Sequence, residues 1–220
     1  MKFHILTIFP EIFQNNSYFN YSILKRAQEK KLITIKPYNL RDFTTDKHKI
    51  VDDAPYGGGP GMVLKIEPIY KAIQKLKTKN SKLKTRVILF STRGKKLDEK
   101  TAQRLAKYKN LILICGRYEG VDERVAQHIA DEEISVGDFV LSGGELPTMV
   151  LIEAVSRFVP KVLGKKESLE TIKGSYPVYT RPEVFITKSE KRKAKKRLKV
   201  PRVLLSGDHK KIDKWRRGMV

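Results

Sequence analysis

Through residue 158, short apolar runs alternate with stretches whose apolar positions recur at helical spacing. The apolar runs predict strands near residues 3–8, 33–38, 86–90, 111–115 and 134–141. The helical spacing predicts helices near residues 21–30, 66–76, 97–108, 121–129 and 145–158. Strands alternating with helices indicate an α/β domain with a mainly parallel sheet, for which an ordinary doubly wound topology is the first expectation. Beyond residue 182 the pattern predicts two basic helices, near residues 189–198 and 209–217.

Residues 111–146 form the stretch around which the chain is organised. The runs 111–115 and 134–141 each end at glycines, Gly116 in one case and Gly143 and Gly144 in the other. Two such strand ends, side by side in a parallel sheet, would turn loops of bare backbone toward one crevice, where a flat ligand could bind. The alternative is a pair of tight turns in a well-packed sheet. Neither loop has the spacing of a dinucleotide or nucleoside-triphosphate site.

Two further segments point to the same crevice. The run 86–90 ends in Ser91, Thr92, Arg93 and Gly94, which would form a third loop there. Residues 41–62 carry no helical period and end in a glycine-rich turn. A long loop in a compact domain is usually functional, so we interpret it as a binding loop rather than a flexible linker.

Composition restricts the protein class. The chain has 220 residues and 40% hydrophobic content, enough for a substantial core. No apolar run approaches the length of a membrane span, and the N-terminus lacks a signal-peptide cleavage pattern. The single cysteine, Cys115, excludes an intramolecular disulfide and indicates a reducing, cytoplasmic setting. Its apolar neighbours favour a buried core thiol over a nucleophile, and the four histidines show no metal-ligand spacing.

Positive charge is concentrated near the C-terminus. The net charge is +22, and residues 188–220 hold 14 Lys and Arg against three acidic residues, which is half of the excess. Positive charges in such excess repel each other unless a polyanion binds them. We therefore interpret this segment as a nucleic-acid-binding region rather than as an ordinary solvated helix face. A membrane surface fits less well, because the basic segments hold few large apolar residues.

Four long motifs in the chain resemble those of a known protein family. They are CGRYEGVDER at 115–124, EISVGDFVLSGGELP at 133–147, RDFTTDKHKIVDDAPYGGGPGMV at 41–63 and YPVYTRPE at 176–183. Together and in this order they resemble the bacterial tRNA (guanine-N1)-methyltransferases of the SPOUT superfamily, over nearly the whole chain. The resemblance implies a trefoil-knotted methyltransferase domain at 1–162, a linker at 163–182 and a basic helical tRNA-binding domain at 183–220.

The resemblance also implies a cofactor site. S-adenosyl-L-methionine would be held mostly by backbone groups, and Tyr118 and Glu119 would reach both the cofactor and the target guanosine. Phe139 stands where a tyrosine is common in the family, and Thr92 where proline is usual. The implied cofactor contacts are Phe90, Ser91, Thr92, Gly116, Tyr118, Glu119, Val136, Gly137, Asp138, Phe139, Val140, Leu141, Gly143 and Gly144.

Methylation of guanine N1 requires removal of the ring proton and stabilisation of charge at O6. In the family an aspartate and an arginine supply these functions. Arg157 matches the arginine, but the short interval 171–175 lacks the aspartate, and we select Glu170 as its substitute. Family members are homodimers that bind the tRNA anticodon arm, and the resemblance leaves room for a magnesium ion.

The sequence therefore predicts a cytoplasmic enzyme that methylates N1 of the guanosine 3′ of the anticodon. Two alternatives stay open. One is ribose 2′-O-methylation, a reaction of the same superfamily, but the motifs at 52–61 and 176–183 argue against it. The other is a non-catalytic tRNA- or ribosome-binding protein, which the missing aspartate keeps in view.

Overall fold

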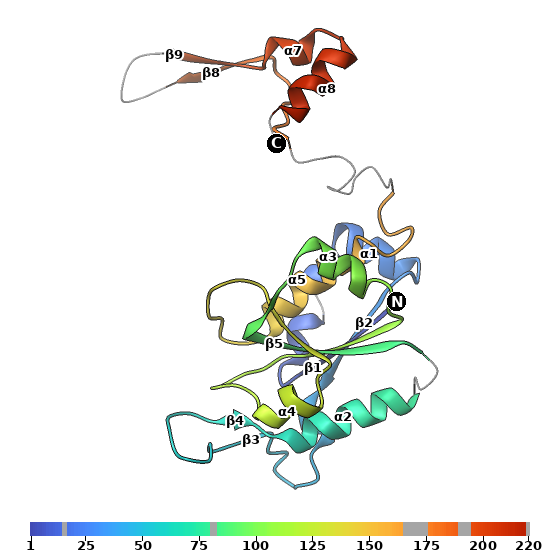
Figure 1. The fold of residues 1–220 in the computed structure, drawn as a ribbon, viewed down its shortest axis with the longest axis vertical. Coiled ribbons are helices and arrows are strands. Elements are labelled where there is room, and N and C mark those ends of the chain that lie inside the picture. Colours follow the sequence, from blue (N-terminus) through green and yellow to red (C-terminus); the bar gives the residue numbers. More distant parts are fainter. Residues whose placement is uncertain (15–16, 80–82, 165–175, 189–194, 219–220) are drawn as a thin grey trace. The chain divides into compact units, whose positions relative to one another are not determined.

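The computed structural model describes residues 1–14, 17–79, 83–164, 176–188 and 195–218, called the described residues below. They belong to two compact units, Met1–Gly164 and Lys165–Val220, which we call unit 1 and unit 2 and describe separately. Figure 1 shows both units, with most of their elements labelled.

Unit 1 is built on a parallel sheet, as the alternating pattern predicts. Its five strands lie in the order β2-β1-β6-β5-β7. Their bounds are β1 Lys2–Thr7, β2 Thr34–Asn39, β5 Thr85–Lys96, β6 Asn110–Ile114 and β7 Glu132–Ser135. A separate antiparallel pair joins β3 (Asp52–Asp53) to β4 (Val63–Leu64). All five residues of the central strand β6 are buried, which explains its uninterrupted apolar run.

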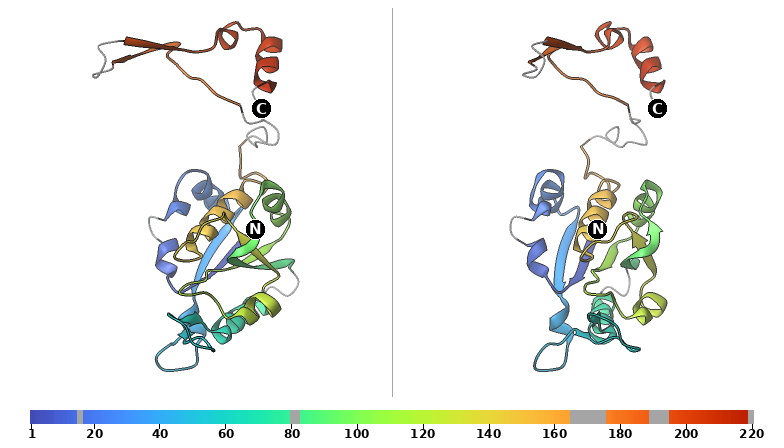
Figure 2. Two further views of the ribbon diagram at one scale, coloured as in Figure 1. Left: turned by 60° about the vertical axis from the view of Figure 1, so that its left-hand side comes forward. Right: turned by 90° about the vertical axis from the view of Figure 1, so that its left-hand side faces the viewer.

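Helices cover both faces of this sheet. Helices α1 (Ser22–Glu29), α3 (Glu99–Leu105) and α5 (Glu145–Ser156) pack on one face, and α2 (Ile66–Lys79) and α4 (Glu123–His128) on the other (Figures 1 and 2). Short 3-10 helices at Pro10–Phe13, Tyr18–Asn20 and Leu40–Phe43 complete the unit. Alternation along β1 supplies both cores, because Phe3 and Ile5 pack on the first face and Leu6 on the second.

The structure corrects two expectations for unit 1. The apolar piece 134–141 is not one strand, because β7 ends at Ser135 and the following residues leave the sheet. The glycine-terminated strands β6 and β7 are also not neighbours, since β5 lies between them. Their loops still meet, because the chain after β7 returns to the end of β6, where the Gly144 amide donates to the Gly116 carbonyl over 2.9 Å.

Unit 2 is only partly helical. It contains α7 (Arg202–Leu205), α8 (His209–Arg217) and an antiparallel ribbon of β8 (Val184–Lys188) and β9 (Lys195–Lys199). The helix predicted at 189–198 is therefore wrong where residues are described, because β9 pairs with β8, whose sequence is rich in β-branched residues. The predicted helix at 209–217 is confirmed. Ile212 is buried, and the Trp215 ring lies 6.3 Å from that of Tyr179.

Candidate functional site: a glycine-lined cavity at the strand ends

The loops after β6 and β7 meet beside β5. The third loop predicted at residues 91–94 is wrong, because β5 continues through these residues to Lys96, and only its register with β7 shifts between Phe90 and Lys95. The loop after β6 is fixed by its neighbours: the Glu119 amide donates to the Met62 carbonyl and the Leu64 amide to the Gly120 carbonyl, each over 3.0 Å. The predicted binding loop thus ends against this loop, and a Cβ on Gly61 would stand only 2.5 Å from Cγ of Glu119. Sharp turns are needed here, and Tyr118 and Gly120 both have positive φ.

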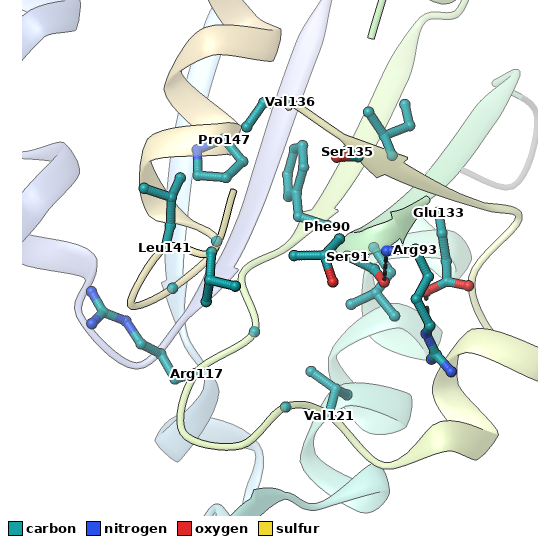
Figure 3. A pocket seen from close by; sticks show the side chains of 18 of the residues that line it. Phe90, Ser91, Arg93, Arg117, Val121, Glu133, Ser135, Val136, Leu141 and Pro147 are labelled. Atoms are coloured by element: carbon teal, nitrogen blue, oxygen red, sulfur yellow. Dashed lines mark hydrogen bonds and ion pairs between the residues drawn. The ribbon is translucent and has the colours of Figure 1, made fainter. Parts of the chain in front are cut away.

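The loops enclose a cavity of about 500 Å³, the position expected for a ligand of an open α/β sheet. Figure 3 shows Phe90 and Ser91 on its floor, with Val136, Leu141 and Pro147 on one side and Val121 opposite. Glycines allow the main chain of the cavity wall to approach neighbouring atoms closely on several sides. A Cβ on Gly144 would lie 2.6 Å from Cα of Cys115, and one on Gly143 would lie 2.3 Å from Nε of Arg117.

The cavity gathers almost all predicted cofactor contacts. Thirteen of the fourteen line it, from β5 and from the loops after β6 and β7. Asp138 is the exception: its side chain is 78% exposed, and it pairs with Lys96 instead. Its place in the motif therefore does not bring its side chain to the cavity.

Of the predicted catalytic residues, Glu119 and Arg157 are described, and they are not brought together within one chain. Glu119 lines the cavity. Arg157 is the C-cap of α5, the helix whose N-terminus borders the cavity at Gly144. At 1.5 Å per residue, α5 carries Arg157 roughly 20 Å from Gly144. Glu170 lies outside the described residues.

Sequence reasoning missed twelve lining residues, which are Leu89, Arg93, Arg117, Gly120, Val121, Glu123, Ala126, Glu133, Ile134, Ser135, Ser142 and Pro147. Most of them stand inside the motifs already quoted, so the signal was present. Ser135 is an example: its hydroxyl donates to the Gly137 carbonyl over 2.9 Å and shapes the turn that leaves β7.

A buried polar cluster holds the cavity wall from outside. Glu145, only 3% exposed, accepts from Thr7 Oγ1 at 2.8 Å and from Arg117 Nε at 2.9 Å. The Arg117 guanidinium also donates to the Ser142 carbonyl and lies 4.9 Å from the centre of the Phe9 ring. In Figure 3 the Arg117 side chain points away from the cavity centre. This cluster therefore ties the loops after β1, β6 and β7 to each other.

A second charged group borders the opposite side. Arg93 donates to Glu123 Oε2 at 2.6 Å and stands 4.0 Å from Oε1 of Glu133. That Glu133 oxygen is buried and accepts no hydrogen bond from the described residues. A hydroxyl or amino group of a bound ligand would satisfy it.

Cys115 lies directly behind the cavity wall as an unreactive thiol. It is fully buried, and its sulfur is 3.1 Å from the Thr148 hydroxyl. Burial, reinforced by the Glu145 carboxylate, raises the pKa of the Cys115 thiol far above its ordinary value. The prediction of a buried core thiol is confirmed.

Two features are absent from the described residues. These residues contain no group of three or more His, Cys, Asp or Glu residues that could hold a metal ion. None of their helices combines the length and apolarity that crossing a bilayer requires.

Comparisons with known proteins agree with the site. The family described as "tRNA (Guanine-1)-methyltransferase TrmD" matches residues 1–219. The chain belongs to this family. It is 52% identical to a tRNA (guanine-N(1)-)-methyltransferase of Carboxydothermus hydrogenoformans, covering 99% of this chain and 81% of that protein. A protein of the same name from Clostridioides difficile is 47% identical, with 99% and 91% covered.

A solved structure extends this agreement to the fold. The crystal structure of tRNA (m1G37) methyltransferase from Aquifex aeolicus is 44% identical, matches with a TM-score of 0.77 and covers 98% of this chain and 87% of that one. Membership in the tRNA (guanine-N1)-methyltransferase family confirms the resemblance carried by the four motifs. It also favours a base methyltransferase over the ribose 2′-O-methyltransferase alternative.

Proposed function

We propose that this protein transfers a methyl group from S-adenosyl-L-methionine to N1 of the guanosine 3′ of the anticodon in tRNA, in the cytoplasm. The observation that carries the proposal is the glycine-lined cavity, most of whose lining residues belong to the two motifs at 115–124 and 133–147. Full-length similarity to proteins named for this reaction supports it.

The cavity fits a flat, partly apolar ligand gripped by main chain. Gly116, Gly143 and Gly144 leave the backbone accessible where a Cβ would meet neighbouring atoms. Apolar walls from Phe90 and Leu141 would sandwich an adenine ring, and Glu133 Oε1, which accepts no hydrogen bond from the described residues, would accept one from a polar group of the ligand. When bound, S-adenosylmethionine supplies an electrophilic sulfonium methyl group.

The protein's own residues would prepare guanine for this methyl group. A carboxylate takes the N1 proton, and a guanidinium stabilises the negative charge that develops at O6. Among the predicted residues, Glu119 is placed at the cavity and contacts the binding loop at Gly61. We assign the base to Glu170 and the O6 contact to Arg157, and both assignments stay predictions.

A homodimer would complete this site. Arg157 stands at the far end of α5 from its own cavity, so a second subunit must bring a cavity to it. The outer face of α5 supports such pairing, because Leu146 and Val150 lie one turn apart and are 58% and 50% exposed. The trefoil knot also belongs to the proposal. It is supported by the passage of residues 136–144 from the edge strand β7 back to the end of β6.

Substrate binding is assigned to unit 2. Half of the net charge lies in residues 188–220, where phosphates of the anticodon arm would relieve the repulsion. We expect these contacts to position the tRNA, while the cavity selects the base.

Methyl transfer from labelled S-adenosylmethionine to a tRNA transcript tests the proposal. Transcripts with guanosine or adenosine 3′ of the anticodon should differ completely, and mass mapping should place the label at N1 of that guanosine. Adding EDTA to the same assay tests a role for magnesium. Tight binding of tRNA without any transfer would instead favour the non-catalytic binding protein.

The base assignment needs matched variants. Glu170→Gln should lower kcat by about 10²- to 10⁴-fold, the usual contribution of a positioned base. Glu167→Gln removes the same charge from the same segment and should leave kcat unchanged. Equal turnover by both variants would show that Glu170 is not the base.

A further inference from the structure

The β8–β9 ribbon of unit 2 is an element that the helical expectation did not anticipate. Its register pairs Val184 with Lys199, Phe185 with Leu198 and Ile186 with Arg197. Among the described residues no third strand joins it. A lone two-stranded ribbon is marginally stable in water, so a partner that covers it would stabilise it.

The ribbon combines unpaired cations with exposed apolar side chains. Lys196, Arg197 and Lys199 are exposed on β9, and none has an ion-pair partner within the part of the chain that the structure describes. Neither strand contains a carboxylate. Three such charges within four residues repel each other and favour a polyanion.

The apolar side chains lie beside these charges. Phe185, Ile186 and Leu198 are 56%, 51% and 44% exposed. Alternation places Ile186 on the face of Arg197 and Lys199, and Phe185 and Leu198 on the face of Lys196. Both faces therefore present a cation next to an apolar surface, which suits a strand of nucleic acid with its phosphates and its flat bases or riboses.

We infer that the β8–β9 ribbon is an RNA-backbone-binding element, which adds affinity for tRNA without reading its sequence. The inference rests on the proposed function for the identity of the RNA. Same-face residues of β9 repeat at about 6.8 Å, so successive cations can follow successive phosphates. Lysine predominates on β9, and an ammonium group attracts phosphate as a point charge without reading base edges.

A membrane surface is the competing partner for a basic and apolar ribbon. RNA is favoured because the chain belongs to a tRNA-modifying family and because the three apolar side chains are split between the two faces. A membrane-binding element would collect its apolar side chains on one face.

The test is the salt dependence of tRNA binding by the full chain, measured by fluorescence anisotropy. The triple variant Lys196→Gln, Arg197→Gln, Lys199→Gln should lower the slope of log affinity against log salt by about 2 to 3, from three lost phosphate contacts. Between about 50 and 200 mM salt, the parent should then lose about 15- to 60-fold more affinity than the variant. The loss of affinity should be equal for transcripts with guanosine or adenosine 3′ of the anticodon.

A charge-matched control separates the ribbon from net charge. Lys71, Lys100 and Lys107 are exposed on or beside helices of unit 1, and their replacement by glutamine removes the same charge. The control should keep the parent slope. An unchanged slope in the ribbon variant, or an equal fall in the control, would overturn the inference.

Three additional measurements distinguish a folding defect, membrane binding and failure of the proposed function from failure of the RNA-binding inference. If the triple variant does not fold, as judged by its melting temperature and S-adenosylmethionine binding, Arg197→Gln alone should lower the slope by about 0.7 to 0.9. Loss of binding to phosphatidylserine vesicles with unchanged tRNA binding would replace RNA by a membrane surface. Ribbon-dependent RNA binding in a parent that transfers no methyl group would support the ribbon and refute the proposed function.

Discussion

Replacing Gly144 with alanine tests whether close backbone packing between two loops builds the cavity. Gly144 has φ −81°, so alanine can adopt its conformation and any cost is steric. The new Cβ would stand 2.6 Å from Cα of Cys115 and 2.9 Å from the Gly116 nitrogen. Ordinary contact begins near 3.4 Å, so one loop must retreat by roughly 1 Å.

That retreat has two costs. The Gly144 amide to Gly116 carbonyl hydrogen bond, now 2.9 Å, would lengthen beyond hydrogen-bonding distance and lose about 1 kcal/mol. Overpacking adds about 1 to 3 kcal/mol. The sum, about 2 to 4 kcal/mol, corresponds to a fall in melting temperature of roughly 5 to 15 °C for a unit of this size. Affinity for S-adenosylmethionine should fall as well, because Gly144 and Gly116 both line the cavity.

Differential scanning calorimetry and titration calorimetry with S-adenosylmethionine measure the two effects. Gly164→Ala is the matched control, since a Cβ there meets nothing within 4 Å. It should leave cofactor affinity unchanged and melt at or slightly above the parent temperature. A Gly144→Ala protein that melts within about 1 °C of the parent and binds the cofactor normally would refute this account of the cavity.

Two further predictions concern buried charges. Glu145→Gln should lower the free energy of unfolding by about 3 kcal/mol, because it leaves Arg117 without its partner. The double variant Glu145→Gln, Arg117→Gln should lose no more stability than the single variant. Denaturant unfolding of both variants measures these free energies. Burial acts to raise the pKa of Glu132, but hydrogen bonds from Arg104 and Arg86 outweigh it and hold that pKa below its ordinary value. The resulting stability is present above the ordinary glutamate pKa of about 4.3 and is lost as pH falls through the lowered folded value. The free energy of unfolding, measured in urea between about pH 3 and 6, should therefore fall less steeply with falling pH in Glu132→Gln than in the parent. An equal pH dependence of the two proteins would contradict the prediction.

The sequence could predict most of the strands and helices and about half of the cavity lining, 13 of its 25 residues. Burial makes a strand such as β6 uniformly apolar, and packing on one face gives α2 its helical repeat, so both leave a periodic signal. Glycines mark the cavity because side chains cannot be accommodated where the loops after β6 and β7 approach each other. These are local constraints, and a single sequence records them.

Strand order and charge pairing could not be predicted, because both depend on distant partners. Nothing in β6 or β7 records that β5 separates them. The sequence KKRLK of β9 has good intrinsic helix propensity, and only its pairing with β8 makes it a strand. Glu145 was recognised as a helix start, but its bond to Thr7 spans 138 residues and leaves no periodic trace.

The charged residues around the cavity differ in how far they are available to a substrate. Arg117 is committed to Glu145, and Arg93 to Glu123. Glu119 has no ion pair among the described residues and is held mainly through its backbone, which donates to Met62. A group fixed by its main chain can present a free side chain without further reorganisation, as preorganised catalysis requires. The paired residues thus build the wall, and we expect Glu119 to be the lining carboxylate that meets an incoming guanine.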